Sequence, residues 1–309
     1  MRVLITGGAG FIGSNIADQL LLRGDKVLIL DDFTTGLRRN VPDHNNCTLV
    51  EGSIVDQALV SSTFEEFNPD IVIHAAASYK DPDAWQQDSL TNVLGTVNVV
   101  KAALALPNSR LIYFQTALCY GVDPAKQPVP LDLPIDPANS SYAISKTAAE
   151  QYIQISGIDY VSFRLANAYG PRNVSGPLPT FFQRLSQGKG CYVVNTRRDF
   201  IFIGDLISCV LPAIDGKGSG TYHISSGADV SIEELYDAVV SSMGIEPKVA
   251  LEKRERAPED AFTILLEPTR AQKDFDWCVS TPLADGVAKA IAYYEEYGIA
   301  ETYTHLSHN

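Results

Sequence analysis

A short apolar run followed at once by three evenly spaced glycines opens the chain. Arg2–Thr6 has the length and composition of a strand, and Gly7, Gly10 and Gly13 follow it in the spacing G-x-x-G-x-x-G. A helical pattern continues over Phe11–Leu22. We expect Gly7 to permit a tight turn, Gly10 to let backbone amides reach a pyrophosphate, and Gly13 to let the helix pack closely on the strand. The motif alone is weak evidence, so its value depends on the surrounding pattern.

Strand-length apolar runs alternate with helical patterns through the first half of the chain. The runs are short and unbroken, as expected for strands buried in a parallel sheet. The expected strands are Arg2–Thr6, Lys26–Leu30, Cys47–Glu51, Ile71–His74, Leu111–Gln115 and Tyr160–Leu165. The helices expected between them are Phe11–Leu22, Gln57–Glu66, Trp85–Leu104 and Ser141–Gln154. This alternation predicts a Rossmann-type, doubly wound parallel sheet (class α/β) over residues 1–165.

The pattern changes after Ala166, where Gly and Pro cluster in residues 170–177. The helices expected beyond this point are Thr180–Gln187, Ile232–Ser242 and Leu283–Tyr297, with short strands such as Gly220–Ile224 between them. We therefore expect a smaller α+β substrate-binding lobe over residues 166–309, with segments near 195–215 and 262–270 returning to the first domain. No low-complexity linker separates the two parts, which favours a site in the cleft between them.

A pair of aspartates ends the second expected strand. Asp31 lies 18 residues beyond Gly13, where a carboxylate can accept hydrogen bonds from an adenosine ribose. Such a carboxylate would repel a 2′-phosphate, so NAD is the predicted cofactor. Arg38 and Arg39 leave NADP as the alternative.

Small residues follow the fourth expected strand, in His74-Ala75-Ala76-Ala77. Ala75 and Ala76 would let a cofactor lie flat across the carboxyl ends of the strands. We interpret His74 as a hydrogen-bonded packing residue rather than a catalyst.

The helical pattern from residue 141 contains Tyr-x-x-x-Lys. Tyr142 and Lys146 are four residues apart and share one helix face. A neighbouring ammonium is expected to lower the pKa of the phenol from its ordinary value of about 10. The phenolate could then accept a proton from a substrate hydroxyl while hydride leaves the same carbon for a nicotinamide.

Taken together, these motifs resemble the extended short-chain dehydrogenase/reductases, and within them the NAD-dependent nucleotide-sugar epimerase/dehydratase family, typified by UDP-glucose 4-epimerase. The resemblance covers nearly all 309 residues. It implies that Thr116, in Phe-Gln-Thr-Ala-Leu-Cys-Tyr-Gly, completes a catalytic triad with Tyr142 and Lys146 by binding the reacting sugar hydroxyl. It also implies that Asn167 contacts the nucleotide-sugar phosphates and that Arg198 clamps the diphosphate.

Of the other positions, Asn92 matches the family, whereas Ser53, Arg256 and Asp260 match it less closely. Asn92 fits a cofactor position, whereas Ser53 replaces the usual Asp, so adenine is expected to be held differently. Arg256 and Asp260 match a later substrate-binding pattern only loosely. The predicted cofactor contacts are Gly7, Gly10, Phe11, Ile12, Gly13, Asp31, Asp32, Ser53, Ile54, Ala75, Ala76, Asn92, Tyr142 and Lys146.

The residues after Thr116 bear on the reaction. In the family, dehydratases carry Asp-Glu there and UDP-glucuronate decarboxylases carry a Glu, but this chain has Ala117-Leu118. We therefore predict C4 epimerisation of a UDP-hexose, UDP-hexosamine or UDP-uronate through a 4-keto intermediate. UDP-glucuronate is disfavoured, because its 4-epimerases tend to have Thr at Asn167 and Arg at Val174.

Several alternatives to that reaction stay open. They are C3/C5 epimerisation, oxidation of a nucleotide sugar, and a non-catalytic protein that senses NAD. The sequence looks most like epimerases of bacterial surface-polysaccharide loci.

The charge balance limits the partners. With 24 Lys and Arg against 37 Asp and Glu, the net charge is -13, which argues against nucleic acid and anionic membranes. No apolar run approaches a membrane span and no signal peptide is visible, so we expect a cytoplasmic protein.

No metal site is predicted either. The five cysteines form no C-x-x-C pair, and His305 and His308 are interpreted as part of a frayed tail.

The resemblance further implies a homodimer formed by the helices expected at Trp85–Leu104 and Ser141–Gln154. An apolar stripe on the first of them fits that role and fits packing on the sheet equally well. The stripe consists of Val93, Val97, Val100 and Ala103.

Overall fold

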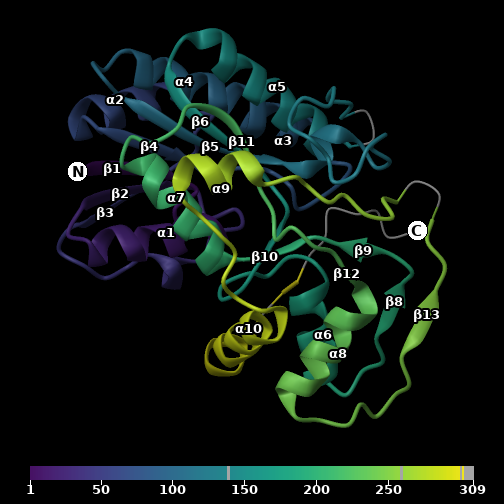
Figure 1. Cartoon of the computed structure of the whole chain (residues 1–309). Helices are drawn as coiled ribbons and strands as arrows, with labels where there is room; N and C mark the ends of the chain where they lie inside the picture. Colours follow the sequence, from purple (N-terminus) through teal and green to yellow (C-terminus); the bar gives the residue numbers. More distant parts are fainter. Residues whose placement is uncertain (138–139, 258–259, 300, 303–309) are drawn as a thin grey trace.

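The computed structural model describes residues 1–137, 140–257, 260–299 and 301–302. At its centre is a seven-stranded sheet in the order β11-β6-β5-β4-β1-β2-β3, with all neighbours parallel (Figure 1). Its strands are β1 (Arg2–Thr6), β2 (Lys26–Asp31), β3 (Cys47–Glu51), β4 (Ile71–His74), β5 (Arg110–Thr116), β6 (Asp159–Leu165) and β11 (Gly220–Ile224). The predicted doubly wound sheet is confirmed.

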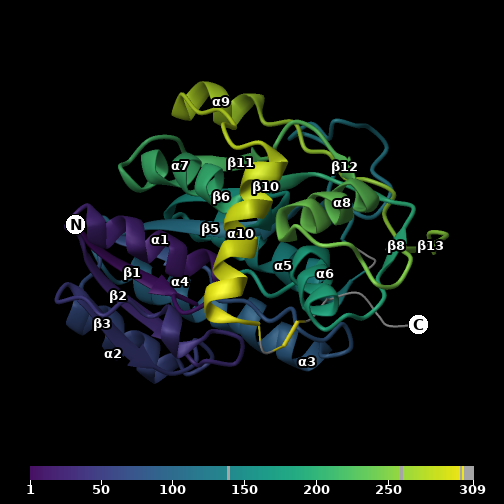
Figure 2. The same ribbon diagram turned by 90° about the horizontal axis from the view of Figure 1, so that it is seen from below.

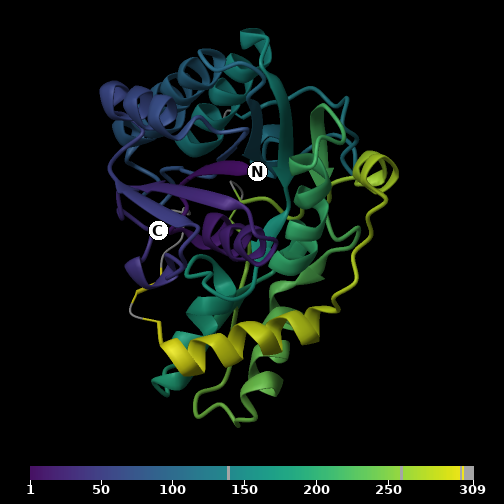
Figure 3. The same cartoon turned by 90° about the vertical axis from the view of Figure 1, so that its left-hand side faces the viewer.

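Successive residues of each strand face opposite layers, because side chains alternate along a strand. Leu4 packs into a cluster with α2 (Gln57–Phe67), α4 (Thr96–Leu104) and α5 (Ser141–Ser156). Val3 and Ile5 pack into a second cluster on the other face. The helices of that face are α1 (Phe11–Leu22), α7 (Ile203–Ile214) and α9 (Thr269–Phe275). Figure 3 shows the blue helix α2 and the purple helix α1 on opposite sides of the sheet.

The sequence pattern predicts the wrong location for one strand. Gly220–Ile224 was expected in the second lobe, but it pairs in parallel with β6 and completes the main sheet. The preceding helix α7 is the crossover that returns the chain to the sheet edge. Tyr222 and Ile224 are buried there, so this short segment gains the same apolar environment as the earlier strands.

The expected helix over residues 85–104 is divided. It consists of α3 (Trp85–Asp88), a π-helical segment η2 (Ser89–Gly95) and α4. The π-helical segment contains the buried residues Thr91 and Asn92. Such segments are frequent at functional sites, and this one lies beside α5.

The remaining elements form a smaller lobe of helices and two-stranded pairs (Figure 2). Its helices are α6 (Pro177–Ser186), α8 (Ile232–Met243) and α10 (Leu283–Tyr297). Its strands are β7 (Asn167–Tyr169), β8 (Tyr192–Val194), β9 (Arg197–Arg198), β10 (Phe200–Phe202), β12 (Val230–Ser231) and β13 (Glu252–Arg254). Phe181, Tyr236 and Tyr294 belong to the same apolar cluster as α1 and α7. The lobe is therefore packed directly on one face of the sheet.

Two searches of the described ranges bear on partners. No helix in them combines the length and apolarity needed to cross a bilayer. Within the same ranges, no three His, Cys, Asp or Glu side chains gather in a group that could hold a metal ion. His305 and His308 lie outside the described residues.

Candidate active site

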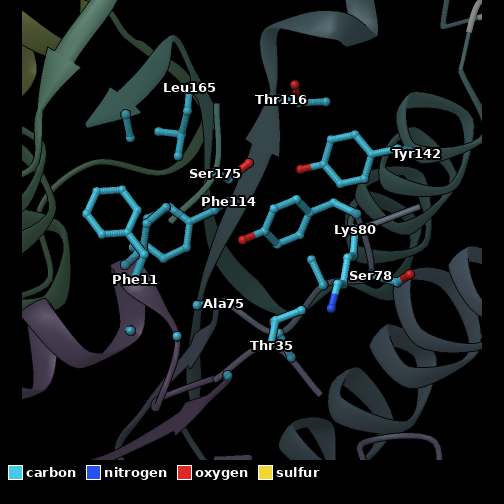
Figure 4. A pocket seen from close by; sticks show the side chains of 18 of the residues that line it. Phe11, Thr35, Ala75, Ser78, Lys80, Phe114, Thr116, Tyr142, Leu165 and Ser175 are labelled. Carbon is cyan, nitrogen blue, oxygen red and sulfur yellow. The ribbon is translucent and has the colours of Figure 1, made fainter. Parts of the chain in front are cut away.

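A cavity of about 320 Å³ lies at the carboxyl ends of the central strands (Figure 4). Its wall includes the glycine turn after β1, the loop after β4, the end of β5 and the start of α5. Residues 165–169, Asn173 and residues 175–178 supply the wall on the side of the smaller lobe. The cavity therefore lies where the two parts of the chain meet, as the sequence predicted.

The glycine turn is built for a close backbone approach. Gly7 has φ +68°, and a Cβ on it would lie 2.5 Å from the backbone nitrogen of Ala76. A Cβ on Gly13 would lie 2.4 Å from the carbonyl oxygen of Gly7. Gly10 is the N-cap of α1 and no side chain caps the helix. Gly10, Phe11, Ile12 and Gly13 all line the cavity, so the first turn of α1 fits a diphosphate.

A carboxylate stands at the end of β2, as predicted. The Oδ2 atom of Asp31 accepts a hydrogen bond from the Ala9 amide (2.9 Å), and Oδ1 accepts one from the Phe33 amide (2.8 Å). Burial raises the pKa of Asp31, while these two amides lower it. Both Asp31 and Asp32 line the cavity. Each carboxylate oxygen accepts through two lone pairs, so Asp31 can also receive ribose hydroxyls.

The arginines that left NADP open are engaged elsewhere. Arg38 pairs with Glu51 (Nη2 to Oε2, 2.6 Å) and stacks on the Phe33 ring. Arg39 donates to the backbone carbonyls at the end of α10, with 2.7 Å to Tyr297 O. Neither arginine lines the cavity, which favours NAD over its 2′-phosphorylated form.

His74 is a packing residue, as interpreted. Its Nδ1 lies 2.6 Å from the Thr6 hydroxyl and its Nε2 lies 2.8 Å from the Thr96 hydroxyl. The Thr96 hydroxyl donates to the Asn92 carbonyl, so it accepts from His74. Burial, helped by the charge of Lys146, lowers the pKa of His74 to about 3. The ring is therefore neutral. The three alanines that follow His74 in the chain, Ala75, Ala76 and Ala77, all line the cavity.

Thr116, Tyr142 and Lys146 are brought together on the cavity wall. Thr116 ends β5 and caps a 3-10 helix over Ala117–Tyr120, its hydroxyl accepting a hydrogen bond from the Leu118 amide (3.2 Å). Tyr142 and Lys146 lie in the first two turns of α5, which Ser140 caps. Figure 4 shows the Tyr142 ring below Thr116, with its hydroxyl directed into the cavity.

Burial dominates the electrostatics of this group. The Lys146 Nζ lies 4.1 Å from the centroid of the Tyr113 ring, and burial lowers the pKa of Lys146 to about 7 although Glu150 opposes this. Burial raises the pKa of Tyr142, and the charge of Asp88 raises it further. The expectation that Lys146 leaves Tyr142 with a lowered pKa is therefore wrong for the protein's own groups, because burial and the charge of Asp88 both disfavour the phenolate.

The predicted substrate residues divide into two groups. Asn167 lines the cavity, and its Nδ2 donates to the Asp199 carbonyl (3.1 Å). Arg198, Arg256 and Asp260 influence one another electrostatically but do not line the cavity. The Arg198 guanidinium donates to the carbonyls of Ala261 (2.9 Å) and Phe262 (3.2 Å). The roles of Asn167, Arg198, Arg256 and Asp260 toward the substrate stay predictions.

Two predicted cofactor residues stand behind the wall. The Ser53 hydroxyl accepts from the Val55 amide (3.4 Å), whereas its neighbours Gly52 and Ile54 line the cavity. The Asn92 amide group bonds both backbone groups of Ser78 and the Ser145 hydroxyl. Asn92 therefore connects the loop after β4 to α5. It does not line the cavity itself.

Sequence reasoning missed part of the wall. Ser78, Tyr79 and Lys80 follow the alanines after β4, and the rule that parallel sheets bind ligands at strand carboxyl ends could have found them. Asn173, Ser175 and the residues up to Leu178 come from the smaller lobe, and no motif marks them. Gln115 was also missed, although it stands directly before Thr116.

Comparison with known proteins identifies the family of the chain. Residues 3–225 match the model of the family described as "NAD dependent epimerase/dehydratase family". The UDP-glucose 4-epimerase of Mycolicibacterium smegmatis is 30% identical, over 95% of this chain and 98% of that protein.

Two crystal structures from Bordetella bronchiseptica are similar throughout. The enzyme WbmH in complex with NAD+ is 57% identical with a TM-score of 0.94, over 96% of this chain and 99% of that one. The enzyme WbmG in complex with NAD and UDP is 39% identical with a TM-score of 0.92, over 100% of this chain and 99% of that one. The chain therefore belongs to the NAD-dependent epimerase/dehydratase family.

Proposed function

We propose that this protein catalyses the reversible C4 epimerisation of a UDP-sugar, with NAD as its cofactor. One observation carries the proposal. Thr116, Tyr142 and Lys146 line the same cavity as the glycine turn and Asp31. The proposed proton acceptor, Tyr142, therefore lies in the same cavity as the residues that fit a dinucleotide. Relatives support the substrate class, because one is a UDP-glucose 4-epimerase and another was crystallised with UDP.

The residues present fit two parts of NAD, the diphosphate and the adenosine ribose. The diphosphate would meet the uncapped first turn of α1, where a side chain on Gly7 or Gly13 would collide with backbone. The adenosine ribose would meet Asp31. When bound, NAD supplies the acceptor and donor for the hydride of the sugar carbon. Because that hydride would return to the same sugar molecule, NAD would be restored to its oxidised form in each turnover.

Proton transfer falls to Tyr142. In the forward step its phenolate oxygen would take the proton of the C4 hydroxyl, which Thr116 would hold by a hydrogen bond, as the C4 hydride leaves, and a 4-keto sugar would result. In the return step Tyr142 gives the proton back after the sugar has presented its opposite face. The forward step requires the phenolate, and burial opposes its formation by raising the pKa of Tyr142. Lys146 and the positive charge of an oxidised nicotinamide would favour the phenolate for the forward step.

The residues after Thr116 favour epimerisation over elimination. Ala117 is buried, and Leu118 is packed against the same small apolar cluster. Neither side chain lines the cavity, and neither can move a proton. Elimination of water requires an acid and a base beside the sugar, and this position offers neither.

A panel of UDP-hexoses, UDP-hexosamines and UDP-uronates, incubated in D₂O and followed by NMR, tests the proposal. We expect one C4 epimer pair to interconvert with no deuterium in the sugar. Deuterium at C3 or C5 would indicate enolisation and therefore C3/C5 epimerisation. A panel in which no sugar changes, together with a protein that retains no NAD, would contradict the proposed function.

A homodimer is a further part of the proposal. Val100 and Ala103 of the expected stripe are buried against the sheet, so they are not available to a partner. Other apolar side chains on the same layer are exposed, among them Leu94 (43%), Ile144 (50%) and Ile155 (79%). Ile144 and Ile155 are eleven residues apart on α5, which places them on one face. Sedimentation velocity of the wild type and of Ile155→Glu tests this surface.

A further inference from the structure

Ser175 presents a hydroxyl to the cavity from the side of the smaller lobe. The residue lines the cavity and is half-buried. Its amide donates to the side chain of Asn173 (2.9 Å), but its hydroxyl has no hydrogen-bond partner within the described ranges. That hydroxyl is not among the buried side-chain atoms that lack a partner, so it keeps accessible surface and a ligand can reach it. Figure 4 shows it directed into the cavity.

The Ser175 hydroxyl does not serve the fold in the way that a serine before a helix usually does. Such a serine commonly caps the helix, its side-chain oxygen accepting a hydrogen bond from a backbone N–H. The N-cap of α6 is instead Gly176, and no side chain caps this helix. Gly176 has φ +90°, a conformation that favours glycine, and it separates Ser175 from the first turn. The hydroxyl is therefore available to a ligand.

Asn173 holds the segment that carries Ser175 to the smaller lobe. Its side chain is buried, and while Oδ1 accepts from the Ser175 amide, Nδ2 donates to the Ala168 carbonyl (3.4 Å). The Tyr294 hydroxyl donates to the Asn173 carbonyl (2.7 Å). These bonds connect the backbone of Ser175 to β7 and α10.

Helix α1 holds the same segment from the side of the sheet. Asn15 Nδ2 donates to the Pro171 carbonyl (3.2 Å), and the Asp18 carboxylate pairs with the Arg172 guanidinium (2.7 Å). The segment is therefore fixed on both sides before a ligand binds. Because little freedom is left to lose, a hydrogen bond to the Ser175 hydroxyl should add to affinity at a small entropic cost.

The position of Ser175 favours a contact with the substrate over one with the cofactor. The residues that fit NAD, among them Gly13 and Asp31, belong to the sheet domain, whereas Ser175 belongs to the smaller lobe. In Figure 4 the hydroxyls of Ser175 and Tyr142 are directed into the cavity from opposite sides. The sugar is the part of the ligands that the proposed function places beside Tyr142.

We propose that Ser175 is a substrate-binding residue whose hydroxyl forms a hydrogen bond with an oxygen of the sugar in the bound UDP-sugar, on the side opposite Tyr142. A hydroxyl both donates and accepts and rotates to suit its partner, so it can bond a sugar hydroxyl in either direction. The identity of the ligand rests on the proposed function. The contact comes from the smaller lobe and is additional to those of Thr116, Tyr142 and Lys146.

Ser175→Ala removes the hydroxyl and keeps the backbone amide that bonds Asn173. Ser186→Ala is the matched control, because Ser186 ends the same helix, is exposed and does not line the cavity. Calorimetry of both variants and the wild type measures the binding of three kinds of ligand. NAD is titrated into protein freed of cofactor, and UDP and each UDP-sugar of the panel are titrated into NAD-loaded protein.

We expect Ser175→Ala to weaken binding of the UDP-sugar by about 5-fold, the effect of one neutral hydrogen bond. Binding of UDP and of NAD should be unchanged, because neither contains the sugar that is epimerised. Ser186→Ala should match the wild type with every ligand. Circular dichroism of each variant verifies folding.

Three results would overturn the proposed contact. The first is unchanged binding of the UDP-sugar to Ser175→Ala. The second is an equal loss for UDP, which would place the contact at the nucleotide or its diphosphate. The third is an equal loss for NAD, which would mean that the substitution disturbs the cavity as a whole.

Failure of the proposed function can be told apart from failure of the contact. A UDP-sugar that binds but is not epimerised contradicts the proposed function, and its affinity for Ser175→Ala still decides whether Ser175 contacts the sugar. A UDP-sugar that is epimerised and binds Ser175→Ala as it binds the wild type contradicts the contact alone. A panel in which no UDP-sugar binds contradicts both.

Discussion

Lys146 is expected to destabilise the folded protein in the absence of ligands. Its ammonium is buried at 3% exposure, and burial lowers its pKa from 10.5 to about 7. Between these two pH values the unfolded chain binds a proton that the folded chain does not. The stability of the wild type should therefore rise with pH across this window, by about 1.4 kcal/mol per pH unit.

Lys146→Met removes that proton-binding group at similar side-chain length. A pKa lowered from 10.5 to about 7 corresponds to about 5 kcal/mol of destabilisation at pH values below 7. Loss of the cation–π contact with Tyr113 (4.1 Å) offsets part of the gain from substitution. The variant should be the more stable protein at pH 7, and its advantage should shrink by about 2 kcal/mol between pH 7 and pH 9.

Urea unfolding of cofactor-free wild type and Lys146→Met at pH 7, 8 and 9 measures this difference. The comparison cancels every other titrating group that the two proteins share. Lys101→Met, which changes an exposed lysine on α4, is the control and should leave the difference from the wild type constant. Parallel curves of stability against pH for the wild type and Lys146→Met would refute the claim that burial lowers the pKa of Lys146 and so destabilises the folded protein.

Three further outcomes follow from the geometry. Tyr142→Phe should reduce turnover by about 10³-fold, as loss of a general base does, while NAD released by denaturation stays stoichiometric; near-normal turnover would rule out Tyr142 as the proton acceptor. Gly13→Ala should abolish the rise in unfolding temperature on adding NAD, since the new Cβ would lie 2.4 Å from Gly7 O; an undiminished rise would show that the turn tolerates a side chain. Arg164→Met should cost about 3–5 kcal/mol in urea unfolding, because it leaves Glu150 buried without its cation, and a loss below about 1 kcal/mol would mean that water reaches the carboxylate.

The first-half fold could be predicted because each strand is a short apolar run bounded by turns. Arg2–Thr6 and Ile71–His74 have the predicted bounds, and the glycine turn lies where its spacing requires. Gly220–Ile224 could not be assigned in the same way. Membership of the main sheet depends on how α7 returns the chain to β6, and this is a tertiary contact that local pattern does not encode.

The site could be predicted where motif spacing fixes geometry, and not where burial decides the chemistry. The interval of four residues correctly placed Tyr142 and Lys146 on one face. It could not reveal that Lys146 is buried and Tyr142 half-buried, and loss of hydration is what raises the pKa of Tyr142 and lowers that of Lys146. Gln115 carries no motif at all.

The central claim is that hydride leaves and returns to the same sugar carbon inside one cavity. A UDP-sugar substrate carrying deuterium at C4 tests this most directly, with NMR of both epimers at equilibrium in ordinary water. The proposed mechanism predicts that the deuterium remains at C4 in the inverted product, because the keto sugar and the reduced cofactor stay together through the turnover. Replacement of that deuterium by hydrogen from water would contradict the mechanism.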